Sequence, residues 1–125
     1  KQTARDLLGK HVNFPLVSVL AGEPIHNAIA MKRKFDISQI PVMQDGKFVG
    51  SVTDTTLLQA LVANPANRDE RVREFMSAPF PIAQASDPLL TLAKQMADGM
   101  GAVLVELGQG KYHIITRHDV VSALS

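Results

Sequence analysis

Hydrophobic residues in the first half of the chain follow a helical pattern set between shorter apolar runs. Ile25, Ala28 and Phe35 recur at the spacing of one helix face. Pro24 suits the first position of that helix. Short apolar runs on either side of Asp45-Gly46 are typical of a hairpin. The pattern predicts strands over 16–20, 40–43 and 48–52, and helices over 24–35 and 54–62.

The second half repeats this succession. Leu89, Leu92 and Met96 lie on one helix face, and Asp87 followed by Pro88 predicts a cap and the first helical position. A glycine-rich turn at 108–110 separates two further apolar runs. The pattern predicts strands over 81–83, 102–107 and 111–115, and helices from 88 and over 119–124.

The two halves align residue by residue. Pro24 corresponds to Pro88, an offset of 88 − 24 = 64, and Thr53 corresponds to Thr116, an offset of 116 − 53 = 63. A one-residue deletion near 98–99 accounts for the difference. Each half is therefore a β-α-β-β-α unit. A unit this small cannot cover its own sheet, so we expect an α/β (α+β) protein in which two units pack sheet to sheet as one domain.

The parts of the chain outside the aligned strands and helices can also be predicted. A short helix is expected over 3–9, a polar joint over 64–71 and a helical turn over 72–76. The predicted segments are an N-terminal helix and linker at 1–11, repeat one at 12–64, a linker at 65–74 and repeat two at 75–125. The chain does not begin with methionine, and we expect it to be part of a longer protein.

A strand-to-helix junction near the C-terminus carries the candidate chemistry. Thr116 ends a predicted strand, and Asp119 follows three residues later in the first helical turn. Backbone N–H groups at such a junction point outward, and the helix dipole favours a phosphate there. A carboxylate can accept hydrogen bonds from the vicinal hydroxyls of a ribose. The alternative is that Asp119 only caps the helix and that Thr116 is only a strand end.

Composition narrows the classes of function. The chain has 125 residues, no cysteine, and a net charge of +1. These features exclude disulfides and thiolate metal sites and give no basic surplus for nucleic-acid binding. We expect no membrane span, no metal at His113 and His118, and no catalytic site, because no serine lies in a nucleophile elbow. We expect a cytoplasmic location.

Three segments resemble a known family. They are 37–42 (ISQIPV), 50–53 (GSVT) and 114–119 (IITRHD). At these segments and in its overall order the chain resembles a tandem pair of CBS domains, also called a Bateman module. The resemblance implies two clefts related by a pseudo-twofold axis, each taking a threonine and an aspartate from one repeat and an adenine-side wall from the other.

The resemblance places one complete adenosine site on this chain. Its expected residues come from both repeats: Glu23, Ala28, Ile37, Ser38, Ile40, Pro41, Ile114, Thr116, Arg117, His118 and Asp119. For Arg117 and His118 the alternative is a solvated loop, and for Ile40 and Pro41 a purely structural role. His113 stands where repeat one has Gly50.

The second cleft departs from the family pattern. Thr56 stands in place of its aspartate, Leu104 in place of its proline, and Gly101 in place of the serine equivalent to Ser38. Asp54 lies two residues too early, about 200° away around a helix. We therefore predict a single competent site, built around Asp119.

Further segments are similar to the C-terminal regulatory region of bacterial cystathionine β-synthase-like enzymes. They are 5–8 (RDLL), 72–76 (VREFM), 79–81 (PFP) and 115–119 (ITRHD). This resemblance implies a parent pyridoxal-phosphate lyase, whose cofactor would lie in a catalytic domain outside this chain.

The expected function is regulatory. An adenosine ligand such as AMP, ATP or S-adenosylmethionine would bind the module and control an attached catalytic domain. One alternative is a ligand-free scaffold that forms a homodimer through exposed helix faces. Another is a CBS module of a transporter or of a nucleotide-synthesis enzyme.

Overall fold

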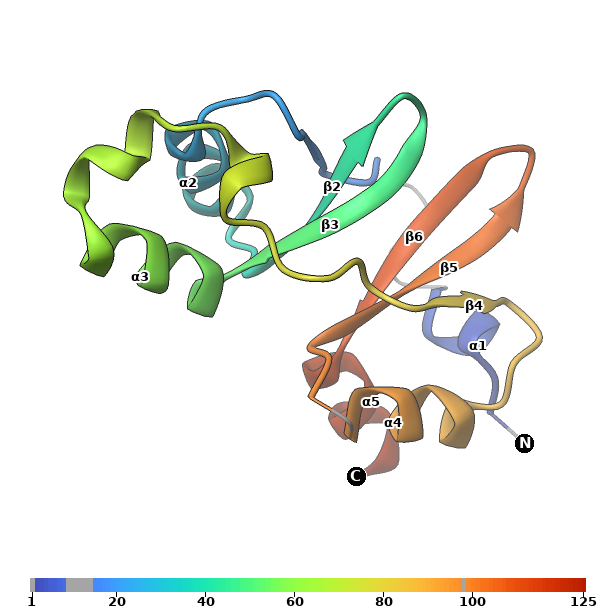
Figure 1. The fold of residues 1–125 in the computed structure, drawn as a ribbon. Coiled ribbons are helices and arrows are strands. Elements are labelled where there is room, and N and C mark those ends of the chain that lie inside the picture. Colours follow the sequence, from blue (N-terminus) through green and yellow to red (C-terminus); the bar gives the residue numbers. More distant parts are fainter. Residues whose placement is uncertain (1, 9–14, 98) are drawn as a thin grey trace. The chain divides into compact units, whose positions relative to one another are not determined.

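The computed structural model describes residues 2–8, 15–97 and 99–125 (Figure 1). Its elements in chain order are α1 (Ala4–Leu8), β1 (Val19–Leu20), α2 (Ile25–Phe35), β2 (Gln39–Gln44), β3 (Lys47–Thr53), α3 (Asp54–Ala63), the 3-10 helices η1 (Pro65–Asp69) and η2 (Val72–Glu74), β4 (Ile82–Gln84), α4 (Leu89–Ala97), β5 (Ala102–Gly108), β6 (Lys111–Thr116) and α5 (Arg117–Leu124).

The chain forms two compact units. The repeat-one unit comprises residues 17–79, and the repeat-two unit comprises residues 1–16 and 80–125. The N-terminal helix α1 therefore belongs with repeat two, although it precedes repeat one in the sequence. The fold is the mixed α/β arrangement expected, with a three-stranded sheet in each unit. Packing of the two sheets against each other stays a prediction.

The two sheets share one topology. Their strand orders are β1-β2-β3 and β4-β5-β6, with the first pair parallel and the second antiparallel. Gln39 pairs with Thr53, and Ala102 pairs with Thr116, so the offset of 63 holds in the register (102 − 39 = 63). The hairpin turn predicted for repeat one is present, and it has positive φ at Asp45 and Gly46.

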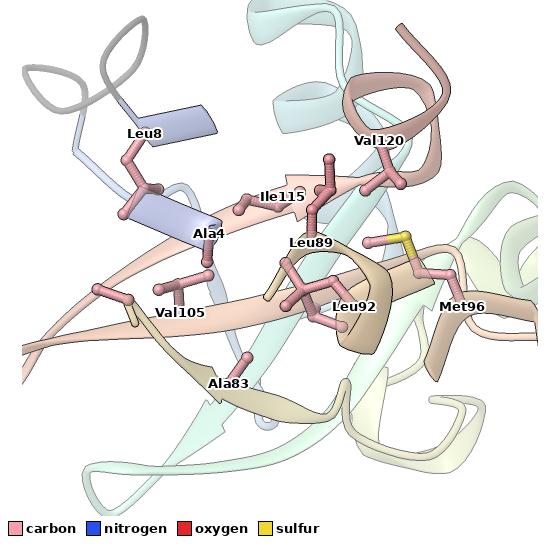
Figure 2. Packing of buried hydrophobic residues seen from close by; sticks show 11 residues of the cluster. Ala4, Leu8, Ala83, Leu89, Leu92, Met96, Val105, Ile115 and Val120 are labelled. Carbon is pink, nitrogen blue, oxygen red and sulfur yellow. The ribbon is translucent and has the colours of Figure 1, made fainter. Parts of the chain in front are cut away.

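Each unit has its own hydrophobic core. The repeat-one core contains Val19 of β1, Ile40 and Val42 of β2, Val52 of β3 and Ile25 of α2. The repeat-two core gathers side chains from the sheet and from α1, α4 and α5 (Figure 2). Its labelled members include Ala4, Leu8, Leu89, Leu92, Val105, Ile115 and Val120.

Several predicted element bounds were wrong: the strand expected over 16–20, for example, comprises only Val19–Leu20. Pro24 precedes α2 as its N-cap, because the helical backbone begins at Ile25. The helix α5 begins at Arg117 rather than Asp119, because the Thr116 side chain already caps it. The helix α4 begins at Leu89, so Pro88 is not its first residue, and the carboxylate of Asp87 accepts a hydrogen bond from Gln84 N at 2.9 Å, which closes the turn before the helix. Residue 9, the predicted end of the first helix, lies outside the described residues.

Candidate ligand-binding site

The junction of β6 and α5 is a capping box built from Thr116 and Asp119. Asp119 Oδ2 accepts from Thr116 N at 2.9 Å and from Thr116 Oγ1 at 3.0 Å. Thr116 Oγ1 in turn accepts from Asp119 N at 3.4 Å. Both residues are half-buried. This arrangement fixes the carboxylate at the positive end of a helix dipole, so the capping role is present.

A carboxylate can combine a capping role with other contacts. The two oxygens of an ionised aspartate offer about four acceptor positions, so one side chain can cap a helix and also accept from a bound hydroxyl. The junction thus holds an acid and a hydroxyl in one fixed geometry, as the sequence predicts.

The neighbouring polar residues differ in placement. Arg117 Nη2 donates to Met100 O at 3.1 Å and to Met96 O at 3.4 Å, so the guanidinium lies beside a carbonyl of the last turn of α4 and one of the loop that follows. The side chain is exposed, as is that of His118. Arg117 therefore has a structural role, and its contact with a phosphate stays a prediction.

Ile114 lies on the face of β6 that is opposite the core. It pairs with Leu104, whereas the core residue Ile115 pairs with Val103. Because side chains alternate along a strand, Ile114 shares its face with Thr116. An apolar side chain and the capping threonine are therefore presented side by side on one face.

The equivalent corner of repeat one is built differently. Thr53 and Thr56 form the same capping box, with Thr56 N donating to Thr53 Oγ1 at 3.2 Å. Thr56 is 2% exposed, and its hydroxyl lies 2.7 Å from Ser77 Oγ. This corner has a hydroxyl of the protein where repeat two has a carboxylate. It therefore lacks the acid that would bind a sugar diol.

Ser77 reaches this corner because its segment lies along the free edge of β3. Ser51 N donates to Ser77 O at 3.0 Å, and Ser77 N donates to Ser51 O at 2.9 Å. Ser51 Oγ also donates to Ala78 O at 2.6 Å. Gly50 permits this approach: a Cβ there would lie 2.5 Å from the sulfur of Met76.

Sequence reasoning missed this edge segment. Met76 was predicted to end a helical turn, which ends instead at Glu74, and no element was predicted for Ser77. The one available signal was Gly50 inside a strand, since an interior glycine often marks a close backbone approach. Asp54, which lies too early in the sequence to replace the missing aspartate, forms an ion pair with Lys32 at 3.0 Å on the exposed surface.

The predicted adenine-side wall lies in the repeat-one unit. Glu23 has a structural task there: its Oε2 accepts from Leu20 N at 2.6 Å and its Oε1 accepts from Asn27 Nδ2 at 3.0 Å. Ala28 and Ile40 are core residues. Their part in binding a ligand stays a prediction.

The remaining wall residues follow α2. Ile37 packs against the core, Ser38 is exposed, and Pro41 is buried and pairs with Ser51 on β3. The structure brings Thr116 and Asp119 together in one unit and the wall residues together in the other. Assembly of the two groups into one cleft stays a prediction.

Among residues 2–8, 15–97 and 99–125, no three histidine or acidic side chains are grouped so as to hold a metal ion. Over the same ranges no helix has the length and apolar character of a bilayer span.

Comparison with known proteins decides the family. The model of the CBS domain matches the chain twice, over residues 4–63 and 72–125. The chain belongs to the CBS-domain family. The two matches cover both repeats, so the chain is a CBS-domain pair.

Solved CBS-domain structures share this fold. A CBS-domain-containing protein from Agrobacterium tumefaciens is 25% identical, with a TM-score of 0.86 over 99% of this chain and 100% of that one. The CBS-domain pair of protein MJ0100, solved with 5′-methylthioadenosine and S-adenosyl-L-methionine, is 22% identical, with a TM-score of 0.81 over 99% and 100%. CBSX2, solved with AMP, is 24% identical, with a TM-score of 0.76 over 99% and 96%.

Proposed function

We propose that this CBS-domain pair is a regulatory module that binds one adenosine ligand through Asp119. The observation that carries the proposal is the fixed Thr116–Asp119 pair, whose oxygen atoms lie 3.0 Å apart at the start of α5. Ribose hydroxyls would donate to the carboxylate, and a phosphate or other anionic group would lie toward the helix N-terminus. The CBS-domain pair of protein MJ0100 and CBSX2, which share this fold, were each solved with adenosine compounds, which supports this ligand class.

The module would act through linkage. A ligand that binds one arrangement of the repeats more tightly than another shifts the population toward it. A coupling free energy of about 1–3 kcal/mol would regulate an attached catalytic domain clearly. No residue described above selects among AMP, ATP and S-adenosylmethionine.

A thermal-shift screen with these three ligands tests the proposal. At about 100 times its dissociation constant, a bound ligand should stabilise the chain by about 2.7 kcal/mol. Asp119→Ala should abolish the shift, because the variant loses the acceptor for the sugar. The matched control is Asp54→Ala, which removes an exposed aspartate from the start of α3, the equivalent helix. A full shift in Asp119→Ala would refute the assignment of the site.

The parent protein is a further part of the proposal. Segments 5–8, 72–76 and 115–119 are similar to the regulatory region of cystathionine β-synthase-like enzymes, so we propose a pyridoxal-phosphate lyase as the attached enzyme, with a cytoplasmic location. The reading frame that encodes this chain should then also encode a pyridoxal-phosphate domain with its lysine. A reading frame that joins the pair to a transporter or a nucleotide-synthesis domain would replace this parent.

A homodimer is the second proposal, and it would hold with or without ligand. Leu58 on α3 is 65% exposed, and its equivalent Val121 on α5 (121 − 58 = 63) is 57% exposed. Val62 and Leu124 extend these faces and are 74% and 60% exposed. The same apolar face is thus left open in both repeats, and a second copy of the chain offers a matching apolar surface.

A further inference from the structure

The N-terminal helix α1 packs behind the junction that carries Thr116 and Asp119. Ala4 and Leu8 are 0% and 2% exposed and belong to the same core cluster as Ile115 and Val120 (Figure 2). In the sequence α1 lies more than a hundred residues before this junction, so the packing is a long-range contact. Helix α1 contacts both β6 and α5.

Three backbone hydrogen bonds tie the N-terminal segment to the loop before α4 and to the first residue of that helix. Ala4 N donates to Asp87 O, and Arg5 N donates to Ala85 O, each at 2.9 Å. Leu89 N donates to Gln2 O, also at 2.9 Å. The segment is therefore part of the fold of repeat two.

The two core residues that lie behind the junction are the sequence neighbours of the two site residues. Ile115 precedes Thr116 on β6, and successive side chains of a strand point to opposite faces. Val120 follows Asp119 on α5 and is 3% exposed. Hence α1 helps to form the inner surface of the junction, while Thr116 presents its side chain on the other face. A change in the docking of α1 must alter the support of the site residues.

We infer that α1 is a coupling element for the Asp119 site, so that ligand binding and docking of α1 favour the same state. This inference rests on the proposed ligand site. The physical basis is that a packed core does not deform continuously. When α1 leaves its place, Ile115 and Val120 lose packing partners and the strand–helix junction loosens. A ligand that needs a rigid junction binds the docked state more tightly. Reciprocity then requires the bound ligand to hold α1 in place by the same factor.

Hydrogen exchange on the intact chain tests the coupling directly. The amide hydrogens of Ala4 and Arg5 report docking of α1, because both donate to the loop before α4. Exchange is measured without ligand and with saturating AMP, ATP or S-adenosylmethionine in turn. A ligand that binds should slow exchange of these two amides by about fivefold or more. In Asp119→Ala the same ligand concentration should leave their exchange unchanged.

The reciprocal measurement uses a variant of α1. Leu8→Ala removes buried side-chain volume from the docked helix and should weaken binding of the same ligand by about fivefold or more. The matched control is Leu90→Ala, which truncates a leucine of the same unit that is 61% exposed, and it should bind as the unaltered chain does. If Leu8→Ala does not fold, the exchange measurement on the unaltered chain decides alone.

The outcomes separate this inference from the proposed function. Ligand binding that depends on Asp119, with unchanged exchange at Ala4 and Arg5, would overturn the coupling and leave the proposed function standing. Equal affinity in folded Leu8→Ala and Leu90→Ala would do the same. Failure of all three adenosine ligands to bind would overturn both.

Discussion

Asp119 and Thr56 occupy the same position in their helices, three residues after the threonine that caps each helix. In both corners the third residue accepts from the backbone N–H of the capping threonine, at 2.9 Å for Asp119 and 3.2 Å for Thr56. The helix cap is therefore preserved while the chemistry differs. Asp119 brings a carboxylate to its corner, whereas the Thr56 hydroxyl is buried against Ser77.

The Thr56–Ser77 contact makes a prediction about stability. Ser77→Ala should lower the free energy of unfolding by about 1 kcal/mol, because it removes a hydrogen bond from a buried hydroxyl. Urea denaturation measures this change. The control Ser86→Ala alters an exposed turn residue and should stay within about 0.5 kcal/mol of the unaltered chain. Equal stability of Ser77→Ala and Ser86→Ala would contradict the contact.

Tyr112 gives a residue-level prediction about pH. It is the only tyrosine, and its hydroxyl donates to Glu106 Oε2 at 3.1 Å. This hydrogen bond, followed by burial and the charge of Glu106, raises the pKa of Tyr112 above the ordinary value of 10.0. The neutral phenol therefore stabilises the fold below the ordinary pKa, and that contribution is lost as pH rises through the raised pKa.

Absorbance titration of the phenol measures this shift. The midpoint of the folded chain should lie above that of the unfolded chain, and Glu106→Ala should move it back toward the unfolded value. A folded-chain midpoint at or below the unfolded one would contradict the Tyr112–Glu106 interaction.

At the scale of elements, the sequence predicted most of the strands and helices because their signals are local. Hairpins were found from paired apolar runs around Asp45-Gly46 and around 108–110, and the helix faces of α2 and α4 from their spacing. The repeat alignment was confirmed by the strand register, in which Thr53 and Thr116 have equivalent partners.

Elements held by long-range contacts were harder to predict. The edge segment at Ser77 has no periodic pattern, since two backbone hydrogen bonds to Ser51 hold it rather than a buried face. The place of α1 was likewise invisible: its apolar residues show that it packs, but not on which repeat. The Thr116–Asp119 pair, by contrast, could be predicted because its two residues lie within one helical turn. The cleft that would join this pair to wall residues such as Ser38 and Pro41 was implied by the resemblance alone and stays a prediction.

At the scale of the whole molecule, the exposed faces of α3 and α5 predict self-association. Leu58→Lys should place a charge on the proposed dimer surface and convert dimers to monomers, as measured by sedimentation velocity. Leu90→Lys, on an exposed position of α4 outside these faces, is the control and should sediment as the unaltered chain does. A monomeric unaltered chain, or a dimeric Leu58→Lys variant, would refute this surface.

The unequal corners also set the expected number of ligands per chain. Repeat two offers Asp119, and repeat one offers Thr56, which Ser77 already contacts. Calorimetric titration of the ligand with the largest thermal shift tests this difference most directly. We expect one binding event per chain, and none in Asp119→Ala. Two equivalent sites per chain, or undiminished binding by a folded Asp119→Ala, would contradict a single aspartate-dependent site.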